Sequence, residues 1–352
     1  MESSHTVYNF SAGPCILPKE VLKQSQEELM SWHGCGASVM EMSHRSKEFM
    51  AILDQAEKDL REFLSIPKNY QVFFFQGGAS MQFSAIVYNL LRGKTKLNYL
   101  TTGAWSEAAI KEAKNLAEVV EAWPDSGSNY NTIPDSSTWV LDKEAAYFHY
   151  CDNETIHGVE FNDFPFDKFE GLDLVCDMSS NIGTRPIPWE KYAVVYAGAQ
   201  KNLGPAGVTV VVVREDLLGH QRKDTPILFD WKAFAGAPSK QHNTPACWPI
   251  YVTGLNLAHM KAKGLEHYQK LAHERASLLY DYIDNSEGYY SNPVDPRYRS
   301  RTNIPFRVKK DAKLEEKFLA EAQAQGLIEL KGHRSVGGCR ASCYNAMPIE
   351  GV

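Results

Sequence analysis

Short, continuously apolar runs recur between residues 71 and 213, and most are followed by a turn and an amphipathic stretch. A strand that is apolar on both faces is typical of a parallel sheet covered by helices on both sides. The runs predict strands at residues 71–75, 97–101, 119–122, 146–150, 172–176, 193–196 and 208–213. We therefore expect an α/β fold with a mostly parallel sheet between two helical layers.

Apolar residues spaced three and four apart predict the helices. They are expected at residues 19–32, 47–64, 81–91 and 106–116, whereas residues 124–137 are rich in turn formers and predict a loop. After Pro249 the pattern predicts one long helix at 252–284, bent near Gly264, and then a strand at 303–308, a helix at 313–325 and a strand at 327–330. The chain is therefore expected to form an N-terminal arm (1–17), a large domain (18–258) and a smaller α/β C-terminal domain (259–352).

Polar residues follow the carboxyl ends of several predicted strands, where open α/β sheets bind their ligands. Asp177 follows one apolar strand, and Lys201 follows the next in a glycine-rich turn. A lysine that forms an imine and a carboxylate that keeps a pyridine nitrogen protonated are the minimum for pyridoxal phosphate (PLP) chemistry. A lone aspartate here more often caps a turn, and a lone loop lysine is more often solvated. The hypothesis therefore depends on the two residues meeting in one crevice.

Two other turns supply candidate contacts for such a cofactor. Gly78 and Ala79 open a helix directly after a strand, and small residues at a helix N-terminus let backbone N–H groups approach a phosphate. Trp105 follows the next strand and offers a flat ring for stacking. Each signal is weak alone, because many such turns contain glycine and a tryptophan more often belongs to a core.

Two basic clusters indicate an anionic ligand. His44 and Arg45 form one, and His333, Arg334 and the nearby Arg340 form the other. Arginine matches carboxylate and phosphate geometry with two parallel hydrogen bonds. The alternative is a set of surface charges, but Arg334 and Arg340 lie among small residues that leave room for a ligand.

The composition narrows the class of protein. A net charge of −6 argues against nucleic acid or an anionic membrane as the main partner. The chain start shows no apolar signal segment, and no run approaches membrane-spanning length. Seven scattered cysteines without a CxxC pair are typical of a reduced, intracellular protein, and we expect no metal site.

Three segments together resemble the phosphoserine aminotransferase branch of the class V aminotransferases, which have the type I fold of PLP enzymes. They are residues 197–202 (Ala-Gly-Ala-Gln-Lys-Asn), residues 42–46 (Met-Ser-His-Arg-Ser) and residues 332–342, which begin Gly-His-Arg. Residues 9–14 and 344–346 match as well. The resemblance covers nearly the whole chain in order, and the Gly-His-Arg segment is specific to the branch.

The resemblance implies a role for each candidate. Lys201 would hold PLP and move a proton, Asp177 would pair with the ring nitrogen, and Trp105 would stack on the ring. Further cofactor contacts would come from Thr155 on the ring hydroxyl, from Gly78, Ala79 and Gln200 on the phosphate, and from Asn243 and Thr244 of a second subunit. Substrate contacts would come from Ser11, His44, Arg45, His333, Arg334 and Arg340, with Arg340 on the α-carboxylate and with His333 and Arg334 supplied by the partner subunit.

The implied activity is transamination between L-glutamate and 3-phosphohydroxypyruvate, which gives O-phospho-L-serine and 2-oxoglutarate in serine biosynthesis. The enzyme is expected to be a cytoplasmic homodimer without a nucleic-acid or membrane partner. Three alternatives stay open. Another class V PLP enzyme, such as a cysteine desulfurase, needs a nucleophilic cysteine; a non-catalytic binding protein should lack the lysine; and a dehydrogenase needs a Gly-x-Gly-x-x-Gly turn near the chain start, which is not found.

Overall fold

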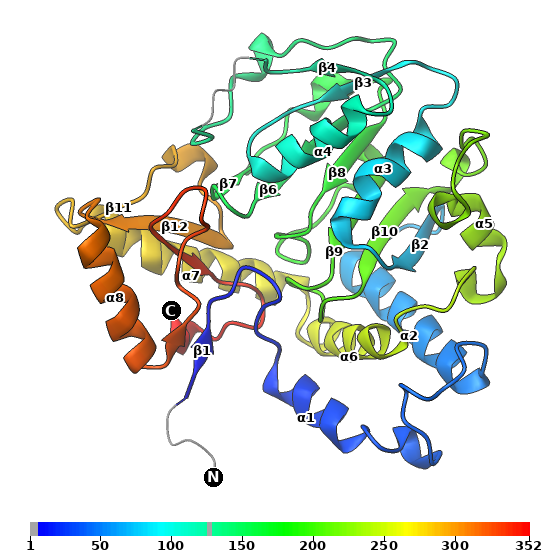
Figure 1. The fold of residues 1–352 in the computed structure, drawn as a ribbon, viewed down its shortest axis with the longest axis horizontal. Helices are drawn as coiled ribbons and strands as arrows, with labels where there is room; N and C mark the ends of the chain where they lie inside the picture. Colours follow the sequence, from blue (N-terminus) through cyan, green and yellow to red (C-terminus); the bar gives the residue numbers. More distant parts are fainter. Residues whose placement is uncertain (1–5, 125–128) are drawn as a thin grey trace.

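The structure is a computed structural model that describes residues 6–124 and 129–352. Residues 125–128 of the predicted loop lie outside the described residues. A large lobe built around one sheet occupies most of the molecule, and a smaller lobe lies beside it (Figure 1). No helix in these two described ranges is long and apolar enough to cross a membrane.

A seven-stranded sheet forms the centre of the large lobe, with the order β2-β10-β9-β8-β5-β3-β4. β10 is antiparallel to both of its neighbours, β2 and β9. The strands from β9 through β8, β5 and β3 to β4 are parallel to one another. The prediction of a mostly parallel sheet is confirmed, and each predicted strand is present within a few residues of its expected bounds. The strands are β2 (Tyr70–Phe75), β3 (Lys96–Tyr99), β4 (Glu118–Glu121), β5 (Phe148–Cys151), β8 (Leu174–Asp177), β9 (Val194–Gly198) and β10 (Thr209–Arg214).

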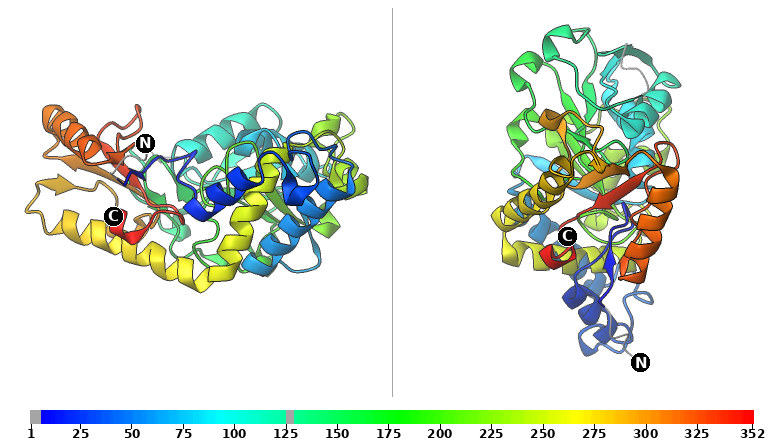
Figure 2. Two further views of the ribbon diagram at one scale, coloured as in Figure 1. Left: turned by 90° about the horizontal axis from the view of Figure 1, so that it is seen from below. Right: turned by 90° about the vertical axis from the view of Figure 1, so that its left-hand side faces the viewer.

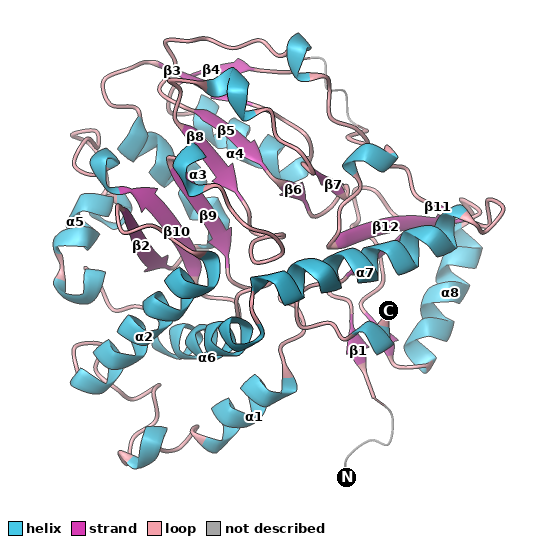
Figure 3. Cartoon of the chain, turned by 180° about the vertical axis from the view of Figure 1, so that it is seen from behind, coloured by secondary structure: helices cyan, strands magenta, loops and turns pink. Residues whose placement is uncertain are grey.

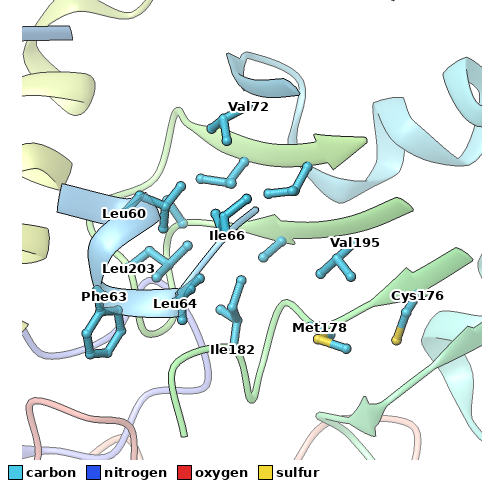
Figure 4. Close-up of a cluster of buried hydrophobic side chains, with 14 of the residues drawn as sticks. Leu60, Phe63, Leu64, Ile66, Val72, Cys176, Met178, Ile182, Val195 and Leu203 are labelled. Atoms are coloured by element: carbon cyan, nitrogen blue, oxygen red, sulfur yellow. The ribbon is translucent and has the colours of Figure 1, made fainter. Parts of the chain in front are cut away.

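Alternate residues of the central strands bury their side chains in two separate cores. Val210 and Val212 of β10 pack on the side of α2 (Lys47–Leu64), whereas Val211 and Val213 pack on the side of α3 (Gly78–Leu90). Figure 4 shows the first core, in which Leu60 and Leu64 of α2 face Val72 and Val195 of the sheet. Burial on both faces explains why these strands are apolar without alternation.

The helices follow the predicted pattern with shifts at their ends. α2 matches its predicted bounds and is capped by Ser46, whose hydroxyl accepts a hydrogen bond from Phe49 N at 3.2 Å. The predicted long helix is two helices, which separate at Gly264 with φ 85°. The prediction that the first helix reaches Trp32 was wrong: α1 ends at Glu27, and Trp32 begins a separate 3₁₀ turn after the extended residue Ser31. The remaining helices are α1 (Lys19–Glu27), α4 (Ala104–Lys114), α5 (Trp231–Gly236), α6 (Cys247–Lys263), α7 (Leu265–Asp284) and α8 (Ala312–Ala324).

The smaller lobe contains a three-stranded sheet, with β12 between β11 and β14, next to α7 and α8 (Figure 2). Its strands are β11 (Tyr290–Ser291), β12 (Asn303–Val308) and β14 (Cys339–Ser342). β12 was predicted, whereas β14 was missed because it carries Arg340 and follows two glycines rather than an apolar run. The predicted domain boundary after residue 258 falls within α6, and the chain bends later, at Gly264.

The N-terminal arm connects the two lobes (Figure 3). β1 (Tyr8–Asn9) pairs in parallel with β13 (Leu327–Ile328) of the smaller lobe. The arm then reaches the turn after β9, where Cys15 N donates to Gln200 O at 3.0 Å. The arm therefore lies directly against the segment that carries Lys201.

Candidate active site

Lys201 lies on the turn that follows β9, and only 8% of it is exposed. Its Nζ atom donates a hydrogen bond to the hydroxyl of Thr155 at 2.6 Å. Burial lowers the pKa of this amine, and the charge of Asp177 offsets part of that effect. A lowered pKa increases the neutral fraction of a lysine, and a neutral amine can attack a carbonyl carbon or accept a proton.

Asp177 is the last residue of β8 and pairs in register with Tyr196 of the neighbouring β9. Its Oδ1 atom accepts a hydrogen bond from Ser179 N at 2.8 Å. Burial raises the pKa of Asp177, while hydrogen bonds from Ser179 and Tyr196 and the charge of Lys201 act in the opposite direction. The carboxylate and the amine therefore share one buried environment at the carboxyl ends of adjacent strands.

Trp105 is the second residue of α4, and 37% of it is exposed. The Nζ atom of Lys201 lies over its ring, 5.6 Å from the ring centroid. The indole therefore forms one wall of the space next to the amine, and part of the indole itself is exposed to solvent.

The N-terminus of α3 meets the same edge of the sheet. Thr209 of β10 pairs with Gly198, which ends β9, and with Phe75, which ends β2 directly before α3. α3 starts at Gly78, and no side chain caps it. Gly77 has φ 86°, and an added Cβ would lie 2.7 Å from Met81 Cβ, so this tight turn requires glycine. The uncapped N–H groups of Gly78 and Ala79 are suited to an anion.

Arg340 approaches Lys201 from the smaller lobe. Its Nη1 atom donates to the carbonyl oxygen of Thr155 at 3.3 Å, while its buried Nε atom has no partner among residues 6–124 and 129–352. Burial lowers the pKa of His333, and the neighbouring charges of Arg340 and Arg334 lower it further. The charges of both arginines thus act on His333 within one chain, and its Nδ1 atom lies 2.7 Å from the Ser335 hydroxyl and accepts from Ser335 N at 3.3 Å.

Other predicted residues do not reach Lys201 within a single chain. His44 and Arg45 lie in the connection between α1 and α2, at the end of the molecule away from the smaller lobe (Figures 1 and 2). His44 Nε2 is buried without a partner in the described part of the chain. Asn243 lies beside the turn before α3, where its Nδ2 donates to Gln76 Oε1 at 3.4 Å, and Thr244 is exposed.

Two more predicted residues lie on segments that border the site. The Gln200 side chain folds over Gly198, where an added Cβ would lie 2.5 Å from Gln200 Oε1. Ser11 lies in the N-terminal arm, and its N–H donates to Asn9 Oδ1 at 2.9 Å.

Sequence reasoning did not assign three buried groups next to the site. Glu154 accepts hydrogen bonds from the first turn of α4. His149 bonds to the hydroxyl of Tyr196, which in turn bonds to Asp177. Glu154 could have been found from the sequence, because it belongs to the cluster of polar residues after a strand end and directly precedes Thr155. Nothing local to the sequence distinguished His149 or Tyr196 from core residues.

Comparison with known proteins decides the family. The family model described as aminotransferase class-V matches residues 7–352. The chain belongs to the class V aminotransferases. It is 52% identical to a phosphoserine aminotransferase of Laribacter hongkongensis, and the match covers 99% of this chain and 96% of that protein.

Solved structures of class V aminotransferases show the same fold. A phosphoserine aminotransferase from Bacillus circulans subsp. alkalophilus is similar with a TM-score of 0.94 and 43% identity, covering 98% of this chain and 95% of that one. A PLP-bound phosphoserine aminotransferase from Trichomonas vaginalis is similar with a TM-score of 0.94 and 40% identity, covering 98% and 97%. The predicted type I fold and the predicted cofactor, PLP, are confirmed.

The residues of this chain fit that cofactor. PLP needs an amine, an acid partner for its ring nitrogen, an aromatic wall and a phosphate site. Lys201 supplies a buried amine, Asp177 a buried carboxylate and Trp105 a flat ring beside the amine. The uncapped start of α3 supplies N–H groups for a phosphate.

Proposed function

We propose that this aminotransferase transfers the amino group of L-glutamate to 3-phosphohydroxypyruvate and releases O-phospho-L-serine and 2-oxoglutarate, in serine biosynthesis. One observation supports this substrate class above the others. Arg340 donates to the carbonyl oxygen of Thr155, and the hydroxyl of the same threonine accepts from Lys201, so a guanidinium lies beside the reactive amine. L-glutamate and O-phospho-L-serine both carry an α-carboxylate and a second anionic group, so a site rich in arginine and histidine suits them.

Each residue near the cofactor has one task in this proposal. Lys201 Nζ would hold the cofactor and would move the proton at the substrate Cα atom. Asp177 would keep a proton on the ring nitrogen, Trp105 would cover the ring, and Thr155 would bind the ring hydroxyl. Gly78 and Ala79 would bind the phosphate through their N–H groups together with Gln200. When bound, PLP supplies a positively charged ring that stabilises negative charge on the substrate Cα.

The substrate residues bind at two ends. Arg340 holds the α-carboxylate, because its guanidinium lies next to Lys201 and its Nε atom has no partner among the described residues. His44, Arg45, His333 and Arg334 bind the distal phosphate of one substrate or the distal carboxylate of the other. Ser11 contacts the substrate from the N-terminal arm. Rotatable histidine and arginine side chains can accept both distal groups, whose shapes differ.

We propose a homodimer because no single chain brings these residues together. His44 and Arg45 lie far from Lys201 within one chain. We therefore propose that each site takes His44 and Arg45 from one subunit and His333 and Arg334 from the other. Asn243 and Thr244 then reach the cofactor phosphate across the same interface. The unpaired cysteines favour a reducing compartment, and we place the enzyme in the cytoplasm.

A cysteine desulfurase is the main alternative within the family, and its nucleophile has no good candidate here. Burial raises the pKa of Cys339 and of Cys343 to about 12. Cys15 contacts the backbone of Lys201, but its thiol donates to Lys201 O at 2.6 Å and burial raises its pKa to about 12 as well. Protonated thiols are poor nucleophiles.

The test is transamination of 2-oxoglutarate by O-phospho-L-serine and by L-serine, followed through glutamate formation. We expect the phosphorylated donor to have the higher kcat/KM by at least about a hundredfold, because it retains a charged hydrogen-bonded group that serine lacks. His333→Ala should reduce this ratio, whereas His220→Ala, an exposed histidine, should leave it unchanged. Equal kcat/KM values for the two donors in the wild type would refute the proposed substrate.

A further inference from the structure

Glu154 is a fully buried carboxylate that the proposed function does not use. It lies on β6 (Asn153–Glu154), directly before Thr155, and 0% of it is exposed. Its Oε2 atom accepts from Trp105 N at 2.9 Å, and its Oε1 atom accepts from Ser106 N at 2.8 Å and from Ser106 Oγ at 2.6 Å. These hydrogen bonds favour the ionised carboxylate, in opposition to burial, which raises the pKa of Glu154.

These bonds close the N-terminus of α4. The preceding N–H of the same turn, that of Ala104, donates to Nδ1 of His157 at 3.3 Å. The donors that α4 directs toward the site are therefore already satisfied by the segment around Thr155. α3, by contrast, has no side-chain cap. Of these two helix starts at the edge of the sheet, only that of α3 is open to a phosphate.

The fit between Glu154 and α4 is tight. An added Cβ at Gly103 would lie 2.4 Å from Glu154 Cδ and 2.6 Å from its Oε2. Gly103 has an extended backbone, so its lack of a side chain serves the close approach of the carboxylate rather than an unusual φ. A carboxylate held this closely fixes the position of the Trp105 backbone. The position of the backbone in turn determines where the indole ring can lie.

We propose that Glu154 is a positioning residue for the cofactor: its carboxylate holds the start of α4 so that Trp105 forms the wall above Lys201. The end of β6 thus positions both the aromatic wall and the amine. Glu154 binds the Trp105 backbone, and the next residue, Thr155, binds the Lys201 amine at 2.6 Å. The charge of Glu154 also raises the pKa of Lys201 against the effect of burial. The proposal rests on the cofactor of the proposed function and not on its substrate.

The test measures cofactor affinity and the shape of the site instead of turnover. Glu154→Gln, Trp105→Ala and the double variant are prepared free of cofactor, and the Kd for PLP is measured by equilibrium dialysis. We expect Glu154→Gln to raise the Kd about tenfold, since an amide has one acceptor oxygen and presents its NH₂ group to a second donor. In the Trp105→Ala background the same change should raise the Kd less than about twofold, because the residue acts through Trp105.

Two further variants keep the test decisive. Ser106→Ala removes the hydroxyl, which contacts Glu154 and also accepts from Thr102 N and Gly103 N, and keeps the two N–H donors of α4. It should raise the Kd about threefold, again with little effect once Trp105 is absent. Asp59→Asn is the matched control, because Asp59 is a buried carboxylate of α2 that pairs with Lys261 instead of α4. It should reduce stability while the Kd and the visible circular dichroism of bound PLP stay unchanged.

Equal increases in Kd for Glu154→Gln with and without Trp105 would overturn the proposal, as would an unchanged Kd in both Glu154→Gln and Ser106→Ala. The outcome is independent of the substrate. A wild-type protein that binds PLP but does not act on O-phospho-L-serine would refute the proposed substrate and leave the Glu154 proposal intact.

Discussion

The Nζ atom of Lys201 donates a hydrogen bond to Thr155 Oγ1 at 2.6 Å. The carbonyl oxygen of Thr155 accepts from Arg340 Nη1 at 3.3 Å. One residue therefore contacts the reactive amine through its side chain and the substrate-binding guanidinium through its backbone. A substitution at Thr155 can remove the first contact and keep the second.

Thr155→Val is expected to raise the Kd for PLP about tenfold, because the amine and the cofactor lose a hydroxyl partner in a buried site. The backbone contact with Arg340 remains, so the KM for the amino acid should change by less than about threefold. Thr253→Val is the control, since the hydroxyl of Thr253 is buried in α6 without a partner in the part of the chain that the structure describes. A larger change in KM than in Kd would contradict the division of roles.

Lys201→Met is expected to change how the stability of the cofactor-free protein depends on pH. Burial lowers the pKa of Lys201, so between that pKa and the unfolded value of about 10.4 the unfolded state binds more protons than the folded state. The free energy of unfolding of the wild type should therefore rise with pH across this window relative to Lys201→Met. Urea unfolding of both proteins from neutral pH to about pH 10 measures the difference, and parallel profiles would contradict the lowered pKa.

Lys201→Met should also abolish the visible absorbance of lysine-bound PLP and reduce transamination by at least about a thousandfold. Lys191→Met, on the exposed side of a 3₁₀ turn, is a suitable control and should retain both. Unchanged absorbance in Lys201→Met would show that another amine holds the cofactor.

Arg301→Met is expected to lower the free energy of unfolding by about 3 kcal/mol, because it removes a partner from a fully buried carboxylate. Arg301 Nη2 donates to Glu160 Oε1 at 2.6 Å, and only 17% of the arginine side chain is exposed. Arg297→Met removes an ion pair with Asp295 at a similar distance, 2.7 Å, on a side chain that is 73% exposed. This control should lose less than about 1 kcal/mol in urea unfolding; equal losses would show that burial does not decide the effect.

His149→Asn is expected to make the protein less sensitive to acid. Burial lowers the pKa of His149 to about 3, so between about pH 3 and the unfolded value of about 6.5 only the unfolded state gains the proton. The free energy of unfolding of the wild type should therefore fall as the pH drops through this window, and the variant should show a shallower fall. Urea unfolding across the window checks this, with the exposed His220→Asn following the wild type.

The sequence by itself determined the layers of the large lobe and the identity of its reactive lysine. Runs such as Val208–Val213 predict buried strands because apolar content and its period depend only on neighbouring residues. A lysine and an aspartate after two such runs had to lie at strand ends, and the family resemblance pointed to the same cofactor that the comparisons confirmed. The bend at Gly264 was also local, since a left-handed glycine interrupts a helix.

Only the tertiary structure decided which of these residues meet. The order of the strands places β8 beside β9 and so brings Asp177 to Lys201, and the antiparallel β10 brings the start of α3 to the same edge. The roles of Glu154, His149 and Tyr196 could not be read locally, because a buried polar side chain is defined by donors and acceptors distant in the sequence. β14 was missed for the same reason: long-range pairing with β12 stabilises that strand and brings Arg340 to the site, although its residues do not form an apolar run.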